Sequence, residues 1–370
     1  MQQDEKKFWI GINMNRAITP QRFHLLLNYF PSVEAIWKAT SDELKSIKGF
    51  KDAADKFCRY RDEEDLKDEL QKCRKLDLRV FTLDDSQYPD SLRAIEKPPP
   101  VLYIKGNYVK RDQLGIAMVG TRKNTNYGKR IAKKLAAQLA NKGFTVVSGM
   151  ARGIDTFSHQ SAIKSDGRTV AVMGTGFGHT YPKSNAGLMN KIADNGAVIT
   201  EFPFTQRPTK WTFPQRNRII SGLTRGTMVV EAPSSSGALI TAHDALSQGR
   251  EVFAVPGDIR KTTMKGTHGL IKDGAKLVED ISDVVEEFRD IQPELPFDQN
   301  EDQNDGEEGK RELDDPKKEV FFHLDFEPIH FNDIVAQTDF SPARLSHIMF
   351  QLEMDDLVER LEGNRWVKTE

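Results

Sequence analysis

Two patterns of apolar and polar positions alternate along the middle of this chain. Between residues 86 and 290, short apolar runs rich in β-branched residues are followed by longer segments with helical spacing of their apolar positions. The first pattern is typical of buried strands and the second of amphipathic helices. We predict strands over residues 114–120, 144–149, 169–174, 197–201, 227–232 and 251–257. We predict helices over residues 127–141, 155–165, 185–195, 215–223, 237–248 and 266–273.

This strand–helix alternation predicts an α/β fold with a doubly wound, mostly parallel sheet. Ligands of such sheets bind in a crevice at the carboxyl ends of the strands. The loops that follow the predicted strands are therefore where the chemistry of the protein is expected.

The first 85 residues have a different pattern, that of short helices separated by breakers such as Pro20, Pro31 and Gly49. Within them, DELKSIKGFKDAADKF (42–57) resembles a helix-hairpin-helix in a small SAM-like helical domain. The amides of such a turn can face a phosphate. A helical module that only packs against the rest of the protein fits the same pattern.

Beyond residue 290 the chain is first acidic and poor in apolar residues, so residues 291–318 are expected to form a disordered linker. The last segment, 319–370, has the outline of a winged helix-turn-helix. Helices are predicted over 331–337 and 341–356, the second with Ser341 as its N-cap and Pro342 in its first turn. Residues 357–368 then form a two-stranded wing that turns at Gly363 and Asn364.

Charge is distributed unevenly, although the net charge of the whole chain is only −2. Residues 291–319 hold eleven Asp or Glu against four Lys or Arg, whereas residues 105–225 hold twenty Lys or Arg against five Asp or Glu. So basic a domain favours a polyanionic ligand. A solvated, lysine-rich surface is the alternative interpretation.

The class of protein is narrowed by three further features. No apolar run approaches the roughly 18 residues of a membrane span, and the N-terminus does not resemble a secretory signal. The only cysteines, Cys58 and Cys73, lack a metal-binding spacing and are expected to be reduced thiols. We therefore expect a cytoplasmic protein without a membrane partner or a metal.

The loop after the first predicted strand, VGTRKNTNYGKR (119–130), is suited to phosphate. Gly120 lets a ligand approach the backbone, Thr121 offers a hydroxyl, and the guanidinium of Arg122 matches phosphate oxygens. It is not a Walker loop, because seven residues separate Gly120 from Gly128, where the motif allows four. Magnesium-dependent ATP hydrolysis is therefore not expected.

Three later strand-end loops are expected at the same crevice. SGMARGID (148–155) is suited to an anion nest, and Lys183 follows the glycines of GTGFGHTYPKSN (174–185). Those glycines do not have the spacing of a dinucleotide fingerprint, so no nicotinamide cofactor is expected. In FPQRNRIISG (213–222), Arg216 and Arg218 lie at the start of a helix, where two cations favour a polyanion. One of the two could instead pair with Glu201 or Glu231 to hold the fold.

Aromatic residues near these cations could stack on bases, although aromatics in such loops are more often part of the core. The candidates are Tyr181, Phe204, Trp211 and Phe213. Catalytic constellations are weak. Ser158 and His159 are adjacent and point in different directions, and no nucleophile elbow surrounds the serine. We predict no catalytic residues.

Six segments of the central region, in order, resemble the DNA-processing protein A (DprA, or Smf) family. They are YPDSLRAIEKPPPVLYIKGN (88–107), IAMVGTRKNTNYG (116–128), SGMARGIDTFSHQSAI (148–163), FPQRNRIISGL (213–223), VVEAPSSSGALITAHDAL (229–246) and GREVFAVPGDI (249–259). The family's usual alanine before the motif histidine is replaced by Ser158, and an asparagine often found in GTN by His268.

The resemblance implies an extended Rossmann-like sheet that binds single-stranded DNA without a cofactor. It also implies a homodimer that loads RecA recombinase during natural transformation, on DNA otherwise coated by single-strand-binding protein. The residues it places at DNA phosphates, with their neighbours, are Gly120, Thr121, Arg122, Lys123, Ser148, Gly149, Ala151, Arg152, Lys183, Arg216, Asn217 and Arg218.

Two other functions remain as alternatives. Nucleoside-monophosphate phosphoribohydrolases have related folds and a PGGxGTxxE motif with a catalytic glutamate, but the corresponding stretch here, PSSSGALITAHDAL (233–246), contains none. The winged segment could instead bind duplex DNA as a regulator. Its presumed recognition helix carries Arg344 and His347 beside several acidic residues, so little net positive charge is available for that.

Overall fold

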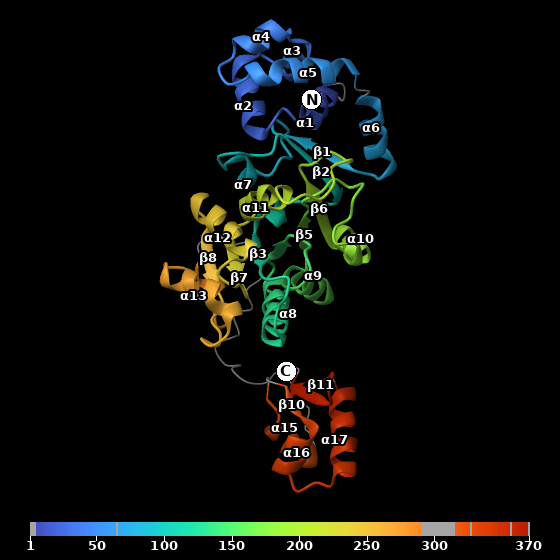
Figure 1. Cartoon of the computed structure of the whole chain (residues 1–370), viewed down its shortest axis with the longest axis vertical. Coiled ribbons are helices and arrows are strands. Elements are labelled where there is room, and N and C mark those ends of the chain that lie inside the picture. The colour runs from blue at the N-terminus through green and yellow to red at the C-terminus, as the bar shows by residue number, and fades with distance from the viewer. Residues whose placement is uncertain (1–4, 64–65, 290–314, 326–327, 356, 369–370) are drawn as a thin grey trace. The chain divides into compact units, whose positions relative to one another are not determined.

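The computed structural model describes residues 5–63, 66–289, 315–325, 328–355 and 357–368. The chain divides into two compact units, Met1–Leu295 and Pro296–Glu370. The first contains a mixed, mostly parallel sheet and the second a small winged helix (Figure 1). The predicted linker, 291–318, lies largely outside the described residues.

Nine strands form the sheet of the first unit, in the order β1-β2-β6-β5-β4-β3-β7-β8-β9. Their bounds are β1 Arg79–Thr82, β2 Val101–Gly106, β3 Gly115–Val119, β4 Thr145–Ser148, β5 Thr169–Val172, β6 Gly196–Thr200, β7 Gly226–Val229, β8 Glu251–Ala254 and β9 Lys276–Leu277. Strands β3 to β9 are parallel, and β1 and β2 extend the sheet antiparallel beyond β6. The predicted α/β fold and its six predicted strands are confirmed.

The path of the chain through the sheet reverses between β3 and β7. From β3 the chain moves through β4 and β5 to β6, then crosses back to β7 and continues in the other direction to β9. The carboxyl ends of β3 and β7 therefore form a topological switch point, where doubly wound sheets bind their ligands.

Helices cover both faces of this sheet. On one face lie α8 (Asn126–Asn141), α9 (Ile154–Lys164) and α10 (Ala186–Asn195). On the other lie α11 (Thr212–Gly222), α12 (Gly237–Ser247) and α13 (Lys265–Lys272). All six match predicted helices. The shorter helices are α7 Asp90–Arg93, α14 Ser282–Glu286, η1 Lys110–Gln113, η2 Lys183–Asn185 and η3 Thr262–Met264.

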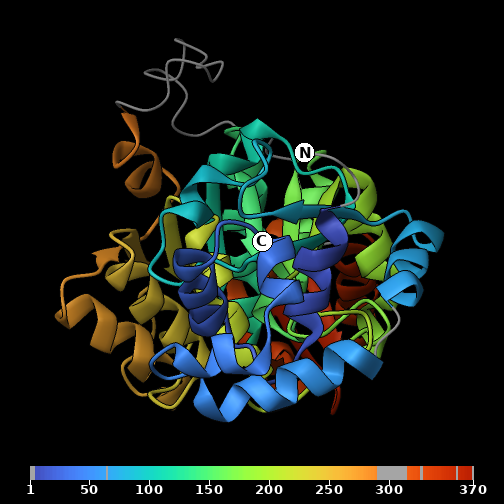
Figure 2. The ribbon, with the colours of Figure 1, turned by 90° about the horizontal axis from the view of Figure 1, so that it is seen from above.

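Six N-terminal helices precede the sheet and pack against its β1–β2 edge (Figure 1). They are α1 Lys6–Met14, α2 Pro20–Tyr29, α3 Val33–Lys38, α4 Ser41–Ser46, α5 Lys51–Glu63 and α6 Leu66–Lys75. The view from above shows them stacked over the sheet (Figure 2). The predicted helix pair within 42–57 is present as α4 and α5, and Gly49 between them has a φ of +87°.

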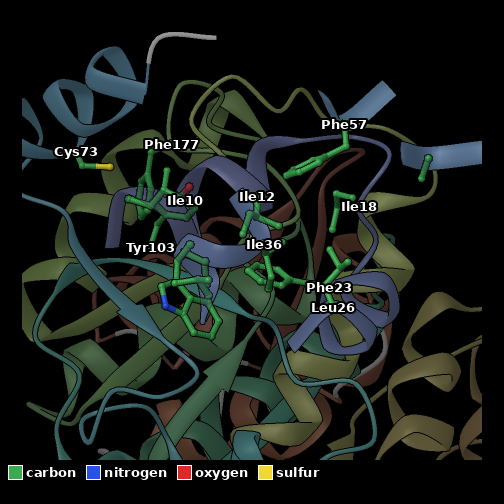
Figure 3. Packing of buried hydrophobic residues seen from close by; sticks show 14 of the residues in the cluster. Ile10, Ile12, Ile18, Phe23, Leu26, Ile36, Phe57, Cys73, Tyr103 and Phe177 are labelled. Atoms are coloured by element: carbon green, nitrogen blue, oxygen red, sulfur yellow. The ribbon is translucent and has the colours of Figure 1, made fainter. Parts of the chain in front are cut away.

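A single hydrophobic cluster joins these helices to the sheet. Ile10 and Ile12 of α1 pack with Tyr103 of β2 and with Phe177, which follows β5 (Figure 3). Polar contacts reinforce the junction, because the Lys6 ammonium donates to the Val80 carbonyl, at 2.7 Å. Strand β1 also begins before residue 86. The helical segment and the sheet therefore share one core.

The second unit contains α15 Asp315–His323, β10 Ile329–His330, α16 Phe331–Gln337, α17 Pro342–Met354, β11 Val358–Leu361 and β12 Arg365–Lys368. Its sheet has the order β10-β12-β11. Ser341 caps α17 by accepting a hydrogen bond from the Arg344 amide, at 3.4 Å. Gly363 and Asn364 both have positive φ and turn the wing. The predicted winged helix is confirmed, and α15 begins within the range predicted as linker.

Candidate nucleic-acid interface

A crevice of about 380 Å³ opens at the β3–β7 switch point. Its walls come from the loops after β3, β4 and β7 and from the start of α11. Its lining includes Gly120, Thr121, Arg122, Ala151, Asp155, Phe213, Arg216, Asn217, Pro233 and Ser236. The structure thus brings together three of the four predicted loops. Sequence reasoning did not select Pro233 and Ser236, although their position after a predicted strand could have identified them.

The β3–α8 loop is packed tightly against its neighbours. A Cβ on Gly120 would lie 2.5 Å from a side-chain carbon of Ile154, so no other residue fits. The Thr121 amide donates to the Glu231 carbonyl, at 2.7 Å, and the Lys123 amide donates to the Thr121 hydroxyl, at 3.2 Å. The Thr121 oxygen therefore serves the loop itself, and the side chains of Arg122 and Lys123 are exposed.

The β4–α9 loop holds an internal carboxylate where the sequence predicts an anion nest. The amides of Gly149 and Ala151 both donate to the Asp155 carboxylate, at 3.2 Å each. The Ser148 hydroxyl donates to the Met118 carbonyl, at 2.6 Å. These three groups are thus satisfied within the protein, and Arg152 is the exposed side chain of the loop.

Glu231 plays the equivalent role at the start of α8. Its carboxylate accepts hydrogen bonds from the Thr125 amide, at 3.0 Å, and from the Thr125 hydroxyl, at 3.1 Å. A Cβ on Gly128 would lie 1.8 Å from that carboxylate, so a glycine is required here. Glu231 beside the start of α8 and Asp155 within the first turn of α9 thus place a protein carboxylate at each helix N-terminus, which offsets the attraction of the helix dipoles for another anion.

Arg216 is only 4% exposed and lies beneath the crevice. Its guanidinium donates to the Gly149 carbonyl, at 2.7 Å, and to the Val172 carbonyl. Burial lowers the pKa of Arg216 to about 10, and burial raises the pKa of Asp155 against the opposing charge of Arg216. Arg216 therefore ties the ends of β4 and β5 together beside a buried carboxylate.

Arg218, two residues further along α11, faces away from this crevice. It forms a 2.5 Å ion pair with Glu201, which is the structural role that the sequence left open for one of the two arginines. Asn217, which does line the crevice, donates from its side-chain Nδ2 to the Gly237 carbonyl, at 3.3 Å.

The cations that project from these loops are Arg122, Lys123, Arg152 and Lys183. Within the described part of the chain, no carboxylate forms an ion pair with any of them. Lys183 begins η2, and Asn185 of the same turn donates to the Met150 carbonyl, at 3.0 Å. This bond fixes the Lys183 segment to the β4–α9 loop.

Aromatic rings accompany the cations. Tyr181 is 45% exposed and its ring centroid lies 5.4 Å from that of Phe213, while the Arg122 guanidinium lies 5.2 Å from the same Phe213 ring. Trp211 is 56% exposed and packs edge-on against Phe202. Phe204 instead packs on the hydrophobic core beside the Lys72 ammonium. Of the four predicted aromatics, Phe213 lines the crevice, Tyr181 packs against Phe213, and Trp211 directly precedes α11.

The candidate catalytic residues do not form a relay. The Ser158 hydroxyl donates to the Ile154 carbonyl, at 2.9 Å, and Nδ1 of His159 lies 2.7 Å from the Thr169 hydroxyl. Burial and the charge of Arg216 lower the pKa of His159 to about 3, so its ring is neutral. The side chains of Ser158 and His159 are therefore both engaged in hydrogen bonds within the protein.

Both units of the chain match families of known proteins. The family model for DNA recombination-mediator protein A matches residues 79–289, and that for the DprA winged helix domain matches residues 307–364. Protein Smf from Synechocystis sp. is 36% identical over 283 residues, which are 75% of this chain and 71% of that protein. DNA processing protein DprA from Bacillus subtilis is 43% identical over 212 residues, which are 56% of this chain and 71% of that protein.

Two solved structures share the fold. The X-ray structure of DNA processing protein A from Streptococcus pneumoniae aligns with a TM-score of 0.67 and 34% identity, over 79% of this chain and 98% of that one. DNA processing protein A from Helicobacter pylori, whose structure concerns its single-stranded DNA binding mode, aligns with a TM-score of 0.52 and 27% identity, over 58% and 97%. In the part of the chain that the structure describes, no helix is both long and apolar enough to cross a membrane.

Proposed function

The chain belongs to the DNA recombination-mediator protein A family, and from this premise we propose that it binds single-stranded DNA along the β3–β7 crevice. Recombination mediation, rather than catalysis, is then its role. The observation that carries the proposal is a set of four exposed cations on the strand-end loops, without ion-pair partners among the described residues: Arg122 lines the crevice, and Lys123, Arg152 and Lys183 lie on the same or neighbouring loops.

The phosphates are assigned to Arg122, Lys123, Arg152 and Lys183. Because Asp155 and Glu231 already accept hydrogen bonds from the amides of Gly149, Ala151 and Thr125, the attraction for a polyanion rests on the four cationic side chains. Each phosphate that a cation neutralises releases a counterion, so binding is salt-dependent and largely independent of sequence.

Bases are assigned to the aromatic surface beside the cations. Phe213, between Arg122 and Tyr181, offers a ring face on which any base can stack. Arg216 and Arg218 act as positioning residues, because their guanidinium groups are engaged inside the protein. Gly120, Thr121, Ser148, Gly149, Ala151 and Asn217 give the crevice its shape. The single-stranded DNA binding of the Helicobacter pylori relative supports this arrangement.

A more specific function is proposed from the resemblance to the DprA family. We assign to the protein the loading of RecA recombinase onto DNA coated by single-strand-binding protein during natural transformation, as a cytoplasmic homodimer. RecA-catalysed ATP hydrolysis on such coated DNA tests the loading, since a loader shortens the lag before hydrolysis. Light scattering after gel filtration tests the dimer. An unchanged lag, or a monomer at micromolar concentration, would remove the corresponding part of the proposal.

Fluorescence anisotropy with a short labelled oligo-dT tests DNA binding directly. For about four neutralised phosphates, the logarithm of the association constant falls against the logarithm of salt concentration with a slope near −3. The double variant Arg122→Ala/Lys123→Ala removes two contacts, so we expect weaker binding and a slope shallower by about 1.4.

A matched control removes the same charge near the amino ends of the central strands, opposite the end where the crevice opens. Arg111 precedes β3 and Lys164 ends α9, and both side chains are exposed. The variant Arg111→Ala/Lys164→Ala should keep the affinity and the slope of the parent protein. Equal losses in the two double variants would show that net charge, rather than the crevice, binds the DNA.

A further inference from the structure

A second pocket, of about 440 Å³, lies where the N-terminal helices meet the sheet. One wall is the α1–α2 connection with the first turn of α2, and the other is the segment from the end of β6 to α11. Ile12 of α1 and Ile18 within that connection are both buried in the shared core, so the first wall is anchored to it (Figure 3). Its size is that of a small-molecule site.

Polar groups with unused hydrogen-bonding capacity gather along this pocket. Oε1 of Glu201, Nη1 of Arg218 and Nδ2 of Asn15 are buried and have no hydrogen-bond partner of ordinary geometry among the described residues. Glu201 is 5% exposed and Asn15 is 3% exposed. Buried polar groups are normally paired, so an acceptor and two donors held in this state point to a partner that completes them.

The rim of the pocket offers an aromatic face. Trp211 is exposed and is held edge-on by Phe202, with ring centroids 6.0 Å apart. Such a face takes a planar, unstacked base. The position also suits a bound strand, because α11 separates this pocket from the crevice. Phe213 and Arg216 line the crevice, whereas Trp211 and Arg218 line the pocket.

We infer that this pocket receives one guanine base of the bound single strand, an inference that rests on the proposed function. Guanine presents two adjacent donors, N1–H and the N2 amino group, beside the acceptor O6. A carboxylate accepts both donors, and guanidinium and amide groups donate to O6. Thymine presents one N–H between two carbonyls, so it pairs less completely with the Glu201 carboxylate.

Entry of the base requires a local adjustment of the lining side chains. The three unused atoms are themselves buried although their residues line the pocket, which Gln206 and Gln215 also line. Burial raises the pKa of Glu201, while the Arg218 guanidinium and the side chain of Gln215 oppose this, so Gln215 is the side chain that a base must displace to reach the carboxylate. The 2.5 Å pair with Arg218 keeps the carboxylate ready to accept hydrogen bonds.

The test compares oligonucleotides that differ in one base. Anisotropy competition on the full chain uses oligo-dT in which the position of a single dG is scanned along the strand, with dA, dC and deoxyinosine at the best position. We expect dG to bind about fivefold or more tightly than all-dT, and deoxyinosine, which lacks the N2 amino group, to lose most of the gain. No dG preference at any position, or an equal gain with deoxyinosine, would overturn the inference.

Variants of Trp211 and Asn15 test whether the guanine preference arises in this pocket. Trp211→Ala should abolish the dG gain, whereas Trp211→Phe should retain part of it. Asn15→Ala should reduce the gain by removing one donor. Circular dichroism confirms that each variant is folded. If Trp211→Ala weakens all oligonucleotides by the same factor, Trp211 is a general stacking surface and the guanine assignment is wrong.

Two further results distinguish a failure of the guanine inference from a failure of the proposed DNA binding. If free dGMP binds at micromolar concentration and a dG in the strand brings no gain, the pocket takes a nucleotide rather than a strand, and the inference as stated is overturned. Absence of any oligo-dT binding would contradict the proposed function itself. Normal dT binding without a guanine preference would leave that function intact and remove only this inference.

Discussion

Asp155 and Glu231 are the residues that most change the prediction made for the strand-end loops. The strand-end loops were expected to present free amides to phosphate, yet both carboxylates accept hydrogen bonds from those loops. The types of the candidate cations and their order along the chain were predictable. The sequence offered a pairing with Glu201 or Glu231 for one of the two arginines, but it could not assign that pairing to Arg218 or predict the burial of Arg216, because both depend on contacts between segments far apart in sequence.

Gly149 carries a prediction about this packing. A Cβ there would lie 2.3 Å from the Arg216 guanidinium, so Gly149→Ala should lower the free energy of unfolding by about 1–3 kcal/mol through overpacking. A Cβ on Gly187, near the start of α10, would have no neighbouring atom within 4 Å. Gly187→Ala should therefore be neutral or stabilising. Urea denaturation measures both, and equal stability of the two variants would contradict the prediction.

His159 makes stability depend on pH. Its folded pKa is lowered to about 3 by burial and Arg216, whereas an unfolded histidine has a pKa of about 6.5. Between these values only the unfolded chain binds the proton, so the contribution is fully present above about pH 6.5 and is lost as the pH falls. From pH 7 to pH 5 the loss is about 2 kcal/mol.

Urea denaturation at pH 5, 6 and 7 measures this dependence in the parent protein and in His159→Gln. The raised pKa values of Asp155 and Glu201 act in the opposite direction, but they are present in both proteins. The variant should therefore have a smaller decrease in the free energy of unfolding on acidification. Parallel pH dependences would exclude His159 as the cause.

At the scale of elements, the strongly periodic segments were predictable and the peripheral ones were not. The six buried parallel strands and their helices follow directly from the hydrophobic pattern. Strand β9 has two residues, and β2 follows a run of three prolines, so neither produced a clear signal. Tertiary pairing with β6 makes β2 a strand.

The N-cap of α17 gives a prediction at this scale. Ser341→Ala removes the side-chain acceptor for the Arg344 amide and should destabilise the helix by about 1 kcal/mol. Ser346→Ala, on the exposed middle of the same helix, should be neutral or slightly stabilising. Amide hydrogen exchange along α17 in the full chain measures both changes. Unaltered protection in Ser341→Ala would mean that packing alone holds the helix start.

At the scale of the whole molecule, the two units have separate cores, and the proposed DNA site lies wholly in the first. A chain that ends at residue 289 should therefore bind oligo-dT within about twofold of the full chain, since all four crevice cations remain. Anisotropy under identical salt makes the comparison. A much larger loss would show that the winged unit contributes to the interface.

The core shared by the N-terminal helices and the sheet also has a practical consequence for anyone shortening this protein. A chain begun at residue 86, where the sequence pattern changes, would lack β1 and would bring Tyr103 and Phe177 to the surface. The apolar surface exposed in this way would favour aggregation during expression. For soluble material, the helical segment has to be kept as part of the same folding unit.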